Sequence, residues 1–83
     1  MITTGSIVKS AFGRDKDRYF VVIKIEGDFV FLVDGKVRKL LSPKKKRMKH
    51  IIKTNDIVSL SDLKTDKQFR TVLSRLNNSQ NKN

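Results

Sequence analysis

The residues with the clearest chemical potential form a basic run near the middle of the chain. The segment "SPKKKRMKHI" spans residues 42–51 and contains His50, the only histidine of the sequence. Its cations are Lys44, Lys45, Lys46, Arg47 and Lys49. Three interpretations fit such a run: a nuclear-import signal, a set of phosphate contacts, or a solvated loop without a binding role. The secondary structure predicted on either side of the run is needed to distinguish these three interpretations.

Two further cations, Arg38 and Lys39, precede this run. No acidic residue occurs between Asp34 and Asp56 to neutralise the segment. Uncompensated charge of this kind suits the phosphates of a polyanion. It suits A-form RNA in particular, which proteins recognise mainly through phosphate, 2′-hydroxyl and shape contacts.

A second basic group lies upstream, where Arg14, Lys16 and Arg18 alternate with Asp15 and Asp17. On extended backbone, alternate side chains share one side, so the three cations would point together. A charge-balanced, solvated turn explains the same pattern almost equally well.

No constellation in the sequence supports enzymatic chemistry. Nucleophilic catalysis needs a nucleophile, a base and an orienting group, and His50 lies among cations that disfavour a further positive charge. Asp residues fall at predicted turns, where they form local backbone hydrogen bonds. The sequence has no Gly-rich phosphate loop, and one histidine without cysteine argues against a transition-metal site. We therefore expect a non-enzymatic protein without cofactors.

Composition indicates one small domain with a polyanionic partner. The 83 residues allow a single modest core, and 19 Lys and Arg against eight Asp and Glu give a formal charge of +11. The longest apolar runs fall far short of the roughly 20 residues of a membrane helix. The amino terminus lacks the features of a secretory signal. A cytoplasmic monomer that does not bind membranes is expected.

Alternating apolar residues predict short antiparallel strands. One begins at Ile7 and ends near Phe12, and the strongest is "YFVVIKIE" at 19–26. Its apolar face comprises Tyr19, Val21, Ile23 and Ile25, and its other face, which begins with Phe20 and Val22, is expected to be covered only at its start.

Gly27-Asp28 predicts a type II′ turn before "FVFLV" at 29–33, and Asp34-Gly35 predicts a type I′ turn before "KVRKLL" at 36–41. After Pro43, the apolar residues expected to return to the core are Met48, Ile51 and Ile52. A small five-stranded antiparallel barrel accounts for these pieces, because closing the sheet hides its edges.

The last third of the chain predicts one amphipathic helix. Thr65 and Gln68 form a capping box. The apolar stripe that follows consists of Phe69, Val72, Leu73 and Leu76. We expect this stripe to pack on the core and close one end of the barrel, within a single domain at 1–76. Residues 77–83, "NNSQNKN", have nothing to bury and are expected to be disordered.

The stretches "GSIVKSAFGRDKDRYFVVIKI" and "LVDGKVRKL", followed by "PKKK", carry a resemblance to a known family. The chain from Gly5 to about Ile52 resembles a KOW module, the small SH3-like barrel of ribosomal proteins and transcription elongation factors. It is similar to large-subunit ribosomal proteins of the L-fourteen-e type, and closer to short bacterial KOW-domain RNA-binding proteins. The family usually has glycine where this chain has Asp17, and Asp tolerates positive φ at a modest cost.

The resemblance implies an RNA-binding protein that contacts ribosomal RNA and neighbouring ribosomal proteins. KOW barrels bind RNA near the motif turn, which makes Arg14, Lys16 and Arg18 candidate phosphate contacts. The basic run, pinned between apolar pairs, is expected to bind phosphates and not to act as an import signal. The alternative is a protein-interaction module of the transcription-elongation type that binds a polymerase or a ribosomal protein. Phe12 is expected to pack in the core in preference to stacking on a base.

Overall fold

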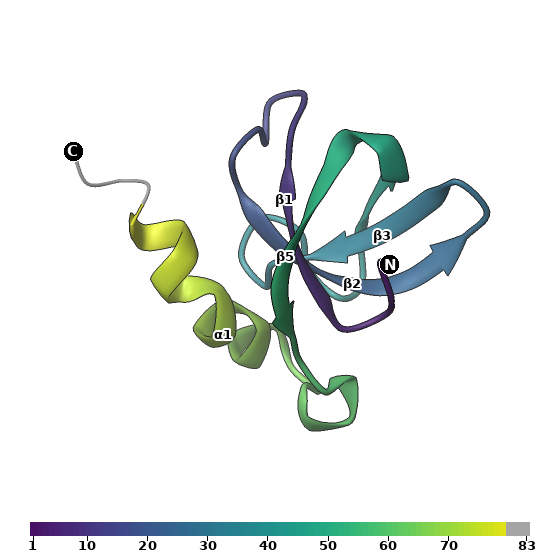
Figure 1. Ribbon diagram of the computed structural model, residues 1–83. Coiled ribbons are helices and arrows are strands. Elements are labelled where there is room, and N and C mark those ends of the chain that lie inside the picture. Colours follow the sequence, from purple (N-terminus) through teal and green to yellow (C-terminus); the bar gives the residue numbers. More distant parts are fainter. Residues whose placement is uncertain (80–83) are drawn as a thin grey trace.

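The computed structural model describes residues 1–79 as a curved antiparallel sheet followed by one helix (Figure 1). The strands are β1 (Ser6–Ser10), β2 (Tyr19–Glu26), β3 (Phe29–Val33), β4 (Lys44–Arg47) and β5 (Ile51–Ile57). Two short 3-10 helices, η1 (Met48–His50) and η2 (Leu60–Asp62), precede helix α1 (Asp66–Ser79). The strands lie in the order β4-β3-β2-β1-β5. The mainly β fold is confirmed and is consistent with a small SH3-like barrel.

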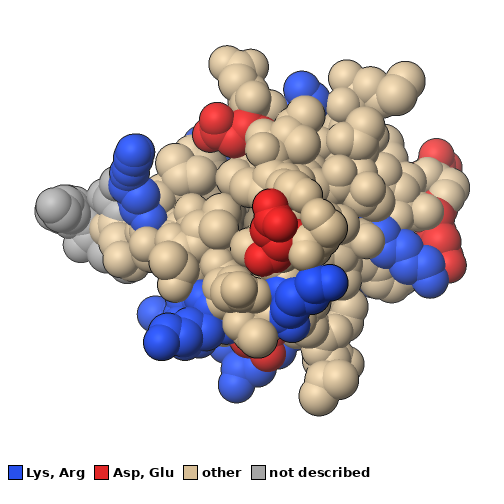
Figure 2. Space-filling model, turned by 90° about the horizontal axis from the view of Figure 1, so that it is seen from below, with Lys and Arg blue, Asp and Glu red and all other residues tan. Residues whose placement is uncertain are grey.

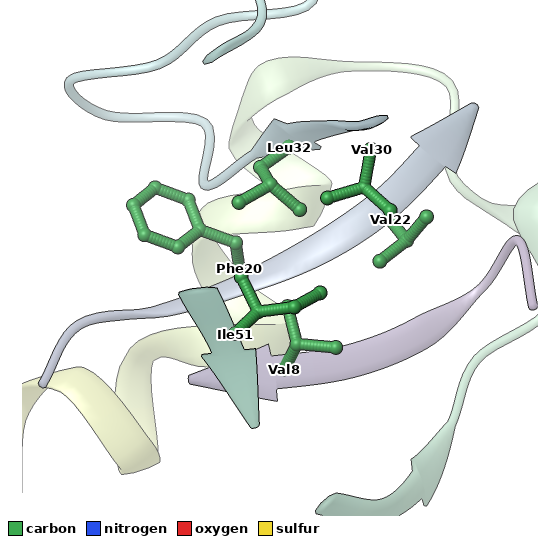
Figure 3. Close-up of a cluster of buried hydrophobic side chains, with 6 residues drawn as sticks. All are labelled: Val8, Phe20, Val22, Val30, Leu32 and Ile51. Atoms are coloured by element: carbon green, nitrogen blue, oxygen red, sulfur yellow. The ribbon is translucent and has the colours of Figure 1, made fainter. Parts of the chain in front are cut away.

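The concave side of the sheet encloses the inner core. Four strands contribute the side chains that meet there (Figure 3): Val8, Phe20, Val22, Val30, Leu32 and Ile51. Burial of one such side chain contributes about 1.5–3 kcal/mol relative to an exposed position. This cluster therefore provides much of the stability of the sheet and fixes the faces of its strands.

Helix α1 covers the opposite, outer side of the same strands. Phe69 and Leu73 pack against Ile7, Val21 and Val33, which point away from the inner core. In Figure 1 the helix lies beside the sheet. The expectation that it closes one end of the barrel is therefore wrong. Both sides of β2 are buried at its start, because the inner core covers one side and helix α1 covers the other.

A bulge in β2 changes the predicted assignment of its faces. The pairing with β3 shifts register between Val22 and Lys24, and an extra residue of this kind reverses the alternation beyond it. Ile23 accordingly packs on the helix side with Tyr19, whereas Ile25 packs against the inner core. The prediction that Ile25 shares a face with Tyr19 is wrong for this reason.

The segment after β3 does not form the predicted hairpin. "KVRKLL" at 36–41 is a loop, and β4 is the strand that pairs with β3. The buried carboxylate of Asp34 accepts hydrogen bonds from the backbone N–H groups of Lys36, Val37 and Arg38, at 2.9, 3.0 and 2.8 Å. These local bonds hold the backbone in a loop conformation that competes with a strand ladder.

The connection from β4 to β5 buries fewer apolar residues than predicted. Met48 lies in η1 and only partly packs on the inner core, and Ile51 is buried. Ile52 is 52% exposed, so its predicted place in the core is wrong. Ile52 follows Ile51 directly, and successive residues of a strand face opposite sides.

The capping box at the start of α1 is confirmed. The N–H of Gln68 donates to Thr65 Oγ1 at 3.2 Å, and the N–H of Thr65 donates to Gln68 Oε1 at 3.0 Å. Val72, which the sequence placed in the apolar stripe, is 36% exposed.

Residues 1–79 contain no helix that is long and apolar enough to span a membrane.

Helix α1 continues beyond the predicted boundary at residue 76. Asn77 is buried and binds the backbone of Tyr19: the Tyr19 N–H donates to Asn77 Oδ1 at 2.8 Å, and Asn77 Nδ2 donates to the Tyr19 carbonyl at 3.2 Å. The predicted disorder is therefore wrong for residues 77–79, which are helical. The rest of that prediction concerns residues 80–83, which lie outside the described residues.

The two-residue link between β2 and β3 and the turn at Asp17 match their predicted conformations. Gly27 has φ 56° and Asp28 has no positive φ, as a type II′ turn requires. Asp17 has φ 72°, and it is the only non-glycine residue within 1–79 in the left-handed region.

Replacing Asp17 with glycine is expected to change the free energy of unfolding by less than about 0.5 kcal/mol, or to raise it slightly. Glycine carries no Cβ penalty at positive φ, although it makes the unfolded chain more flexible. The lost ion pair with Lys9, at 3.9 Å on the surface, contributes little. Thermal melts of Asp17→Gly and Asp17→Val should differ clearly, because a β-branched residue fits this conformation poorly. Equal melting temperatures would contradict this account of the turn.

Candidate nucleic-acid interface

A cleft of about 420 Å³ lies between the β1–β2 loop, the β3–β4 loop and β4. Its basic lining residues come from both groups that the sequence singled out: Arg14, Arg18, Arg38, Lys44 and Lys46. These groups are separate in the sequence. The fold brings them to one site, because β4 pairs with β3, which pairs with β2.

Two of the five cleft cations are already paired with carboxylates. Arg18 Nη2 lies 3.2 Å from Asp34 Oδ2, and Lys46 Nζ lies 2.9 Å from Asp15 Oδ1. Asp34 is only 2% exposed, so this pair belongs to the wall of the cleft. Arg18 and Lys46 thus shape the cleft more than they offer free charge.

The other three cleft cations have no such partner. Arg14, Arg38 and Lys44 form no ion pair with any residue of the described chain. The backbone N–H of Arg38 is held by the buried Asp34 carboxylate, and Lys44 stands on a paired strand. These cations can therefore bind a phosphate without first breaking an internal salt bridge.

Asp15 connects the β1–β2 loop to β4. Its Oδ1 accepts hydrogen bonds from Ser10 Oγ at 2.7 Å and Lys46 Nζ at 2.9 Å, and Lys46 also donates to the Phe12 carbonyl at 2.7 Å. Burial acts to raise the pKa of Asp15, but the hydrogen bonds from Lys46 and Ser10 and the charges of Lys46 and Lys44 outweigh it. They lower the pKa below its usual value. Asp15 therefore stays ionised and keeps the loop attached at neutral pH.

Phe12 lies at the surface beside the cleft and does not pack in the core. Its side chain is 56% exposed, and its ring centroid lies 4.7 Å from that of His50. The Ala11 N–H donates to the His50 carbonyl at 2.9 Å, so the β1–β2 loop adjoins η1. The prediction for Phe12 is wrong because Phe20 supplies the aromatic ring of the inner core. An exposed ring next to a basic cleft can stack on an unpaired base.

The remaining predicted site residues do not line the cleft. Lys45 and Arg47 alternate with Lys44 and Lys46 along β4. They therefore point to the side of the strand that faces away from the cleft, where they lie over phenylalanine rings of β3. Lys16, Lys39 and Lys49 are exposed elsewhere on the surface. The sequence located the basic segment, but it did not show that β4 divides its cations between two surfaces.

Figure 2 shows that basic side chains form separate groups on the face seen there, with acidic side chains scattered between tan surface. On this face the charges are therefore grouped and not evenly spread. The way in which cations are grouped on the surface, and not the total charge alone, therefore indicates a binding site.

Within residues 1–79, no three His, Cys, Asp or Glu side chains lie close enough together to hold a metal ion.

Comparison with known proteins does not assign the chain to a family. No protein-family model matches the chain, and no curated protein matches it. The function must be inferred from the cleft itself.

Proposed function

We propose that this protein is a non-enzymatic, KOW-type RNA-binding protein that contacts ribosomal RNA in the cytoplasm. The observation that carries the proposal is the meeting of two separate basic groups in one cleft. The fold, which is consistent with a small SH3-like barrel, supports the resemblance described above.

The distribution of charge in the cleft favours a phosphate backbone as the ligand. Arg14, Arg38 and Lys44 are unpaired within the described residues, while Arg18 and Lys46 are held in place by carboxylates. Phosphate contacts of this kind fix the position of a nucleic acid and supply affinity without reading its sequence. Phe12, exposed at the rim, adds a stacking surface that suits RNA with unpaired bases.

The triple variant Arg14→Gln, Arg38→Gln, Lys44→Gln is expected to bind structured RNA roughly a hundredfold more weakly at 0.1 M salt. Each lost phosphate contact should make the slope of log affinity against log salt shallower by about 0.7–0.9. Titration of a labelled ribosomal RNA fragment over a series of salt concentrations measures both quantities. Arg14 is exposed, Arg38 and Lys44 are partly exposed, and none of the three forms an ion pair within residues 1–79, so the melting temperature should hardly change.

The matched control is Lys53→Gln, Lys64→Gln, Lys67→Gln, which removes the same charge from exposed positions outside the cleft. It should lose much less affinity than the cleft variant. Equal losses in both variants would mean that only net charge matters and would refute a cleft site. If the protein did not bind RNA but bound a protein partner with an affinity that does not depend on salt, the alternative of a protein-interaction module would be favoured.

A further inference from the structure

Two phenylalanine rings on β3 form an aromatic face that is distinct from the cleft. Phe29 and Phe31 are two residues apart, so their side chains project from the same side of the strand, and both are partly exposed. Val30, between them, points into the inner core. Helix α1 packs on Val33 at the end of the strand and leaves the two rings uncovered.

Three cations surround these rings. Lys45 Nζ lies 4.6 Å from the centroid of the Phe29 ring and 5.9 Å from that of Phe31. Arg47 Cζ lies 5.1 Å from the Phe29 centroid, and Lys24 Nζ lies 5.3 Å from the Phe31 centroid. Strand pairing places Arg47 opposite Phe29, and Lys24 and Lys45 on either side of Phe31.

The aromatic face carries a net positive charge. Its cross-strand neighbour Glu26 lies opposite Phe29 and is paired with Lys24 at 3.0 Å on the surface. Lys45 and Arg47 have no ion pair within the described residues. Their charges rest only against aromatic rings, and a cation–π contact at an exposed site is worth about 0.5–1 kcal/mol. A phosphate can therefore recruit these cations at little cost.

We propose that Phe29 and Phe31 bind the unpaired bases of a single-stranded RNA segment, with Lys45 and Arg47 on its phosphates. Rings on alternate residues of a strand are about 6.8 Å apart, which is room for one base on each ring. Every base has a π-face, so stacking tolerates any sequence, whereas paired bases inside a duplex are not available to the rings.

This inference rests on the proposed function and extends it to a second surface. Lys44 and Lys46 of β4 face the cleft, while Lys45 and Arg47 of the same strand face the rings. One RNA molecule can thus present a structured part to the cleft and an unpaired part, continuing over the edge strand β4, to the aromatic face.

The test compares a short oligouridine with an RNA duplex of equal phosphate number, using the variant Phe29→Leu, Phe31→Leu. Leucine keeps an apolar side chain over the sheet but removes the ring. Oligouridine affinity should fall at least about tenfold, because stacking of each base is lost. Duplex affinity should stay within about twofold, because phosphate contacts remain. Ile52→Ala, an exposed apolar truncation on β5, is the control and should change neither.

The outcomes separate this inference from the proposed function. Should the cleft variant weaken both RNAs while the phenylalanine variant binds oligouridine normally, the aromatic face is not a base-binding site, although the proposed function stands. Should the cleft variant bind both RNAs normally, the proposed function itself fails. If the phenylalanine variant does not fold, NMR of the wild-type ring protons during oligouridine titration decides: unchanged Phe29 and Phe31 resonances overturn the inference, and shifted ones support it.

Discussion

Replacing Gly35 with alanine is expected to lower the free energy of unfolding by about 3 kcal/mol or more. Gly35 is buried with φ 78°, and a Cβ there would collide with the carbonyl oxygen of Asp66 and lie 2.8 Å from the Arg70 nitrogen. The left-handed conformation costs about 1–2 kcal/mol for an L-residue, and overpacking typically adds 1–3 kcal/mol. Both opposing atoms are helix backbone, so the helix must move. Chemical denaturation measures the loss.

Gly27→Ala is the matched control for Gly35→Ala. Gly27 also has positive φ, at 56°, but nothing lies within 4 Å of a Cβ built there. The free energy of unfolding of this variant should fall only by the cost of the left-handed conformation, about 1–2 kcal/mol. Losses of equal size at the two positions would contradict a close approach between the β3–β4 loop and α1. The Gly35 variant should also bind RNA more weakly, since the same loop carries Arg38 into the cleft.

Phe69→Ala is expected to lower the free energy of unfolding by about 3–5 kcal/mol, the range for a fully buried phenylalanine. The side chain is 1% exposed and packs between α1 and the outer side of the sheet. Its removal leaves a cavity against Val21 and Val33, which the rigid sheet cannot close. Urea denaturation followed by circular dichroism measures the change.

The comparison variant on the same helix is Val72→Ala, at a position that is 36% exposed. It should cost less than about 1 kcal/mol, because surface substitutions have small effects. A Phe69→Ala loss as small as that of Val72→Ala would mean that α1 does not pack on the sheet in solution.

Features encoded by neighbouring residues were predictable from the sequence, and features set by distant contacts were not. The span of β2, the Gly27-Asp28 link and the capping box at Thr65 depend on local backbone preferences. Asp34-Gly35 offers an equally good local turn signal. It does not form a hairpin because the Asp34 carboxylate caps loop amides and Gly35 lies against α1, which is some 30 residues away.

The same division applies to the candidate site. The positions of the cations could be read directly from the sequence. Which of them are neutralised depends on Asp15 and Asp34, whose partners are remote in the chain. The exposure of Phe29 and Phe31 depends on how far α1 extends over the outer side of β3, and strand alternation alone does not contain that information.

Strand β4 has an unusual freedom in its alignment. A strand is normally held in register by alternating apolar and polar side chains, because a slip of one residue exchanges its two faces. All residues of Lys44–Arg47 are basic, so a slip would again place cations on both sides. Two contacts supply the missing specification: Lys46, within the strand, binds Asp15, and the N–H of Met48, directly after the strand, donates to the Asp28 carbonyl at 2.7 Å. A slip of one residue would therefore leave both surfaces charged but would break these two contacts, so they, and not an apolar pattern, hold β4 in register.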